Sequence, residues 1–129
     1  MLISLKLESE VPLYEQLRNE IILGIAKGLL QPEEKLPTVR QLADELGINN
    51  MTVNKAYALL KQEGYLVIDR RHGAKVSLPF KKQTSAAPSE QLEQKLELMV
   101  AEAALQGLTA DSFHKLCSAI YNKMHILHN

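Results

Sequence analysis

The chain has 129 residues, 46% of them hydrophobic and 23% charged, which allows one ordinary domain with a short extension and excludes two full domains. Its 15 basic and 15 acidic residues cancel to a net charge of zero, which counts mildly against a nucleic-acid partner because most DNA-binding domains are basic. No apolar run approaches the roughly 20 residues of a membrane span, and the start lacks the features of a signal peptide. The single cysteine, Cys117, cannot form an internal disulfide. We therefore expect a cytoplasmic protein.

The first 28 residues predict a short strand followed by a helix. Apolar side chains alternate along residues 2–7, as they do in a half-buried strand. Pro12 suits the first turn of a helix, where its missing N–H is no loss, and Gly28 ends that helix after about Lys27. We expect its apolar face to form one wall of a core. This face consists of Leu13, Leu17, Ile21 and Ile25.

Residues 36–64 contain two helical patterns that meet at a turn containing Gly47. Thr38 can cap the first helix, with Gln41 completing a capping box, and Asn49 can cap a second helix from about Asn50 to Glu63. The pattern predicts a helix-turn-helix, although a plain helical hairpin is the commoner structure. The predicted inward faces are Val39, Leu42, Ala43 and Leu46 in the first helix, and Val53, Ala56, Tyr57 and Leu60 in the second.

Two β-prone runs follow the second helix. YLVI at residues 65–68 and KVSL at residues 75–78 flank the polar turn DRRHGA, with Gly73 at its tip. A helix-turn-helix followed by a basic-tipped hairpin is a winged helix. The predicted fold class is therefore mainly α with a small β-hairpin.

The last third of the chain predicts a linker and a two-helix tail. We assign residues 1–79 to the winged helix, 80–88 to a Pro-containing linker and 89–129 to the tail. One tail helix starts at Ser89 and stops before Gly107, and the other is capped by Thr109 and carries apolar residues as far as Leu127. Their apolar faces either pack on the winged helix or pair with a second copy, and we favour the second copy. The predicted dimerisation residues are Leu92, Leu96, Met99, Phe113, Leu116, Ile120, Tyr121 and Met124.

Residues 12–76 resemble the DNA-binding domain of the GntR family of bacterial transcription regulators. The matching segments are PLYEQLRNEIILGIAKGLL, LPTVRQLADELGI, MTVNKAYALLKQEGYL and the wing HGAKV, which cover about half the chain with their spacing intact. The opening ISLKLESEVPLYEQL and the short tail are also similar to the YtrA-like subgroup, which has no large ligand domain.

The resemblance implies a sequence-specific transcription regulator, expected to be a homodimeric repressor that binds double-stranded DNA at an inverted-repeat operator. It implies that Arg40 contacts a guanine edge or a phosphate, that the start of the second helix of the motif meets base edges, and that the wing tip enters the minor groove. Asn50 and Asn54 stand where the family often has arginine, and Arg71 replaces the usual first glycine of the wing. The expected DNA-binding residues are Thr38, Arg40, Asn49, Asn50, Thr52, Asn54, Lys55, Arg71, His72 and Gly73.

Other classes of function are weaker predictions. A winged helix used as a protein-interaction or adaptor module is the alternative, and the zero net charge is its best support. The sequence has no phosphate loop, nucleophile elbow or paired-carboxylate site, so we expect neither an enzyme nor a cofactor. His114, His125 and His128 lack an acidic partner at a metal-binding spacing. A small-molecule effector stays open, and the sequence identifies none.

Overall fold

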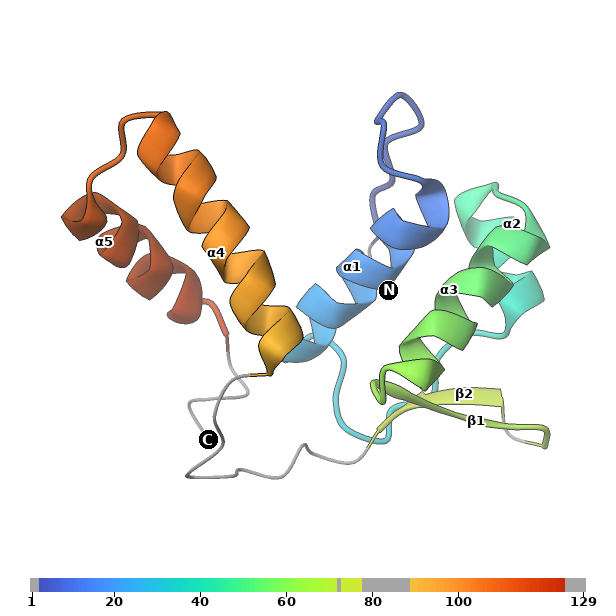
Figure 1. Ribbon diagram of the computed structural model, residues 1–129. Coiled ribbons are helices and arrows are strands. Elements are labelled where there is room, and N and C mark those ends of the chain that lie inside the picture. Colours follow the sequence, from blue (N-terminus) through green and yellow to red (C-terminus); the bar gives the residue numbers. More distant parts are fainter. Residues whose placement is uncertain (1–2, 72, 78–88, 125–129) are drawn as a thin grey trace. The chain divides into compact units, whose positions relative to one another are not determined.

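The computed structural model describes residues 3–71, 73–77 and 89–124, which fall into two compact units. The first unit holds the helices α1 (Leu13–Ala26), α2 (Val39–Leu46) and α3 (Asn50–Gln62) and the strands β1 (Leu66–Asp69) and β2 (Gly73–Val76). The second unit holds α4 (Glu90–Leu105) and α5 (Ala110–Tyr121) (Figure 1). The predicted linker, residues 80–88, lies outside the described residues.

The first unit is a three-helix core completed by the hairpin (Figure 1). Helix α3 packs against both α1 and α2, and β1 follows it directly. Every residue expected on the inward face of α3 is buried, as are Leu17, Ile21 and Ile25 of α1. The winged-helix prediction is confirmed. The buried core consists of Leu17, Ile21, Ile25, Leu30, Leu36, Leu42, Ala43, Val53, Ala56, Tyr57, Leu60, Leu66, Ala74 and Val76.

The helix starts follow the predicted capping pattern. Thr38 Oγ1 accepts a hydrogen bond from the backbone N–H of Gln41 (3.1 Å), and Gln41 Oε1 accepts one from the N–H of Thr38 (3.0 Å). Gly47 ends α2 with a φ of 69°, a left-handed conformation that glycine adopts without a Cβ clash. Asn49 Oδ1 then accepts from the N–H of Met51 (2.8 Å) and begins α3.

The strand predicted for residues 2–7 is wrong over its described part, because residues 3–7 are not in a strand. The side chain of Gln16 takes the place of a neighbouring strand. Its Oε1 accepts from the Lys6 N–H (2.8 Å), and its Nε2 donates to the carbonyls of Lys6 (2.9 Å) and Val11 (2.7 Å). The alternating Ile3 and Leu5 still pack against the core, half-buried.

The hairpin pairs Leu66 with Val76 and Asp69 with Gly73 in antiparallel register. Strand β2 begins two residues earlier than the predicted run at Lys75. The loop before α2 pairs with it along its other edge, since Leu36 N–H donates to the Ala74 carbonyl (2.8 Å) and Val76 N–H donates to the Glu34 carbonyl (2.9 Å). Together with the pairing to β1, these bonds give both edges of β2 a hydrogen-bonded neighbour and attach the wing to the core.

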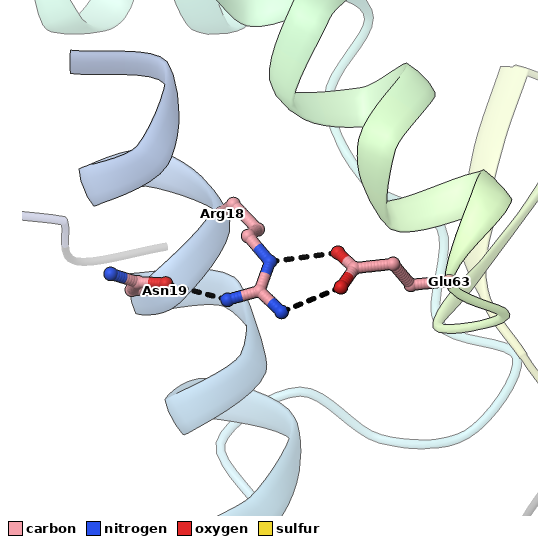
Figure 2. A network of polar contacts seen from close by, with 3 residues as sticks. All are labelled: Arg18, Asn19 and Glu63. Atoms are coloured by element: carbon pink, nitrogen blue, oxygen red, sulfur yellow. Dashed lines mark hydrogen bonds and ion pairs between the residues drawn. The ribbon is translucent and has the colours of Figure 1, made fainter. Parts of the chain in front are cut away.

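An ion pair joins the middle of α1 to the end of α3. Arg18 donates from Nε and Nη2 to the two carboxylate oxygens of Glu63, each at 2.7 Å, and from Nη1 to Asn19 Oδ1 at 2.8 Å (Figure 2). The hydrogen bonds that Arg18 donates to Glu63 raise the pKa of Arg18 above its usual value. This forked pair links α1 to the C-terminal end of α3 beside their packed core.

In the second unit, Thr109 caps α5 as predicted and accepts from the N–H of Ser112. The first tail helix was expected to start at Ser89, and this residue is the cap of α4, accepting from the N–H of Leu92. The last helix is shorter than expected. It ends at Tyr121, because the next bonds, from Lys123 to Ile120 and from Met124 to Tyr121, span three residues instead of four. Met124 therefore follows the helix, and Leu127 lies outside the described residues. None of the helices within the described ranges is long and apolar enough to cross a membrane.

Candidate nucleic-acid interface

The start of α3 presents polar side chains to solvent because its opposite face is buried. Val53 and Leu60 are completely buried, and the Tyr57 hydroxyl donates to the Pro37 carbonyl at 2.8 Å. Burial in this position raises the pKa of Tyr57. These contacts fix the rotation of α3 about its axis. They leave Asn50, Asn54 and Lys55 exposed and Thr52 half-buried.

Two of the expected DNA-binding residues are also helix caps. The Thr38 hydroxyl and the Asn49 amide oxygen already accept backbone hydrogen bonds, so capping occupies the acceptor atom of each side chain. The side chain of Asn49 also carries an amide nitrogen, which is a donor. Arg40 is exposed in the first turn of α2, on the same unit as the start of α3.

The wing supplies exposed cations next to a tight turn. Asp69 Oδ1 accepts a hydrogen bond from the Arg71 N–H at 2.9 Å, which closes the turn after β1. Gly73 has a φ of 75°, and a Cβ built there would meet no atom within 4 Å, so conformation and not space favours glycine. Arg70 and Arg71 are exposed. His72, also expected at the tip, lies outside the described residues.

A hollow beside α3 is lined in part by residues that the sequence analysis did not assign to a site. The Nζ of Lys55 lies 4.0 Å from the centroid of the Tyr14 ring on α1. Met51 lies in the first turn of α3, and 77% of its surface is exposed. The spacing of residues along the chain could not reveal the pairing of Tyr14 with Lys55, because it depends on the packing of α1 on α3. The hollow is lined by Pro12, Leu13, Tyr14, Met51, Thr52, Asn54, Lys55 and Ala58.

Seven of the eight predicted dimerisation residues lie on α4 and α5, two helices without a buried residue, and Met124 follows α5. Phe113 and Met124 are half-buried, and the other six are exposed. Among the described residues, no group of three or more His, Cys, Asp or Glu side chains could hold a metal ion. His125 and His128 fall outside those residues.

Comparison with known proteins finds regulators of transcription. A family model described as "Bacterial regulatory proteins, gntR family" matches residues 13–76. The HTH-type transcriptional repressor YtrA of Bacillus subtilis is 30% identical over 107 residues, which cover 83% of this chain and 82% of the relative. In matches to other regulators the aligned part covers a smaller share of the relative, for example 54% of the HTH-type transcriptional regulator Rv1152 of Mycobacterium tuberculosis and 13% of the HTH-type transcriptional regulator YdcR of Escherichia coli.

Two solved structures bear on the fold and on the ligand. YtrA from Sulfolobus acidocaldarius, a GntR-family transcription factor, is 37% identical, with a TM-score of 0.61 over 78% of this chain and 97% of that one. The AraR DNA-binding domain in complex with operator ORX1 is 30% identical, with a TM-score of 0.52 over 58% of this chain and 93% of that one. The second structure was determined with its operator DNA, and it matches a little more than half of this chain.

Proposed function

The chain belongs to the gntR family of bacterial regulatory proteins and is a DNA-binding transcription regulator, and we propose on this premise that it is a homodimeric repressor of an inverted-repeat operator. It acts in the cytoplasm, where bacterial DNA lies. Membership of this family does not favour the alternative of a protein-interaction or adaptor module. A small-molecule effector is compatible with this function, and its identity stays open.

The observation that carries the proposal is the polar start of α3 over a buried core. Asn50 and Asn54 are exposed amides, which suit the paired acceptor and donor on the adenine edge in the major groove. Arg40 suits guanine or phosphate, and the half-buried Thr52 suits phosphate beside the helix N-terminus. In this proposal the first turns of α3 enter the major groove.

The remaining contacts come from the caps, the flank of α3 and the wing. Thr38, Asn49 and Lys55 border the same start of the motif, and Lys55 supplies a cation there. Arg71, His72 and Gly73 enter the minor groove, where a cation is favoured and glycine permits close approach. Net charge does not oppose this arrangement, because exposed Arg40, Lys55, Lys61, Arg70 and Arg71 gather on the helix-turn-helix and wing.

In this proposal the tail pairs two chains, so that the dimer carries two DNA-binding units. Helices α4 and α5 have no buried residue, and exposed leucines of α4 include Leu92 (57%), Leu96 (48%) and Leu98 (64%). Covering one large apolar side chain is worth roughly 1.5–3 kcal/mol, so pairing two tails offers a large gain. A two-fold dimer sets two recognition helices on successive major grooves, about 34 Å apart.

Selection of bound sequences from a random DNA pool by the full chain tests this function. We expect an enriched site with two inverted half-sites about one helical turn apart, bound by two chains per duplex and weakened steeply by salt. A pool that shows no enrichment contradicts sequence-specific binding. A single half-site bound by one chain contradicts the dimer.

A further inference from the structure

One large apolar side chain stands on the outer side of the recognition helix. Met51 is 77% exposed, whereas Val53, Ala56, Tyr57 and Leu60 of the same helix are buried. The backbone around it is fixed, because its N–H is bound by the capping side chain of Asn49. A methionine that is 77% exposed, with the exposed amides of Asn50 and Asn54 nearby on the helix, contributes little to the core of the unit.

The position of Met51 on α3 directs it away from the core. Leu60 lies nine residues further on, which at 3.6 residues per turn is the opposite side of the helix, and Leu60 is completely buried. Asn54 and Lys55, three and four residues after Met51, lie on nearly the same side and line the same hollow. Met51 therefore belongs to the surface that faces the DNA bases in the proposed function.

The major groove offers this side chain one chemical partner. Base edges there carry hydrogen-bond acceptors and donors, and the only apolar group among them is the C5-methyl of thymine. A thioether side chain is flexible and polarizable, so it can follow a methyl group over a range of positions. Amides beside it select adenine, and adenine in one strand places thymine in the other.

Building on the proposed function, we infer that Met51 is a specificity-determining residue that selects one thymine in each half-site by contact with its C5-methyl group. Burying one methyl group corresponds to about a fourfold change in affinity. The contact is apolar, so it adds specificity without adding to the salt dependence of binding.

Uracil substitution in the selected operator tests this contact, because deoxyuridine lacks only the C5-methyl and pairs as thymine does. Each thymine is replaced in turn, and affinity is measured for the full chain, for Met51→Ala and for Met51→Leu. The unmodified protein should lose about fourfold in affinity at one thymine per half-site. Met51→Ala should bind the thymine operator about fourfold more weakly and should show no further loss with uracil there. Met51→Leu should keep most of the uracil effect.

Asn54→Ala is the matched control on the same face of α3. It should weaken operator binding and leave the uracil effect intact, because the amide does not touch the methyl group. The inference is overturned if every thymine tolerates uracil, if the half-sites hold no thymine, or if Met51→Ala retains the uracil effect. A chain that prefers no DNA sequence fails the proposed function itself, which is a separate result from sequence-specific binding that ignores uracil.

Discussion

The ammonium group of Lys55, in the recognition helix, lies 4.0 Å from the centroid of the Tyr14 ring in α1. Cation–π contacts at exposed sites contribute about 0.5–1 kcal/mol, so the ring limits the positions that the flexible lysine samples. Tyr14 is itself half-buried against the core, which gives the ring a fixed location. The first helix thus contributes to the proposed DNA-facing surface by orienting a residue of the third.

Replacing Tyr14 tests this orienting contact. Tyr14→Leu should weaken operator binding by up to about 1 kcal/mol, the value of the cation–π contact, and Tyr14→Phe should bind nearly as the unmodified chain does, since it keeps the ring. Lys55→Met should lower the slope of log affinity against log salt by about 1. In a Lys55→Met background, Tyr14→Leu should have no further effect on affinity. If its effect there is undiminished, Tyr14 acts independently of Lys55.

We expect substitutions in α3 to change base preference, and substitutions in the wing to change the affinity for all DNA sequences. Asn54→Ala removes an exposed amide, and we expect a loss of about 1–3 kcal/mol on the preferred site with relaxed preference at one base position. Arg71→Ala removes a wing cation and should weaken binding more evenly across sequences. Competition binding to the selected site and its single-base variants measures both effects. An unchanged affinity for Asn54→Ala would show that the recognition face lies elsewhere on α3.

The buried hydroxyl of Tyr57 makes stability depend on alkaline pH. Burial raises the pKa of Tyr57, chiefly by desolvation and secondarily through Glu45, so the folded protein keeps the phenol neutral when the unfolded chain, with a pKa of about 10, ionises. Below about pH 10 both states are neutral and the contribution is constant. As pH rises above about 10, the unfolded state gains the extra charge and folding stability falls.

Tyr57→Phe should therefore show two opposite effects. At pH 7 it loses the hydrogen bond to the Pro37 carbonyl, which costs about 1 kcal/mol of unfolding free energy. Above about pH 10 the stability of Tyr57→Phe should fall less steeply than that of the unmodified chain, so the difference in unfolding free energy between the two proteins narrows. Urea denaturation at pH 7 and at pH 10.5–11.5 measures both effects, with Tyr65→Phe as the control for a less buried tyrosine. Parallel pH profiles for Tyr57→Phe and the unmodified chain would contradict this assignment.

Local patterns in the sequence predicted most of the first unit. Thr38 with Gln41, Gly47 and Asn49 mark helix boundaries through the backbone groups within a few residues of them, so the sequence contains their partners. The buried face of α3 followed from helical spacing in the same way. The strand expected at residues 2–7 failed because alternation does not show which group will bind the backbone, and here Gln16 does so.

Contacts between distant residues could not be predicted. Arg18 and Glu63 are 45 positions apart, and Tyr14 meets Lys55 only because α1 packs on α3. The exposure of Met51 became informative only once the opposite face of α3 was seen to be buried. The DNA-contact roles and the dimer residues stay predictions, because they depend on partners that a single folded chain does not contain.

Sedimentation of the full chain and of Ile120→Asp at micromolar concentration tests most directly whether the tail makes the dimer that reads the operator. Ile120 is 45% exposed on the apolar side of α5, and Ser118→Asp adds the same charge about 160° around the helix as a control. We predict a dimer for the full chain and for Ser118→Asp, and a folded monomer with much weaker operator binding for Ile120→Asp. A monomeric full chain, or an Ile120→Asp variant that still dimerises, would contradict the tail-mediated dimer.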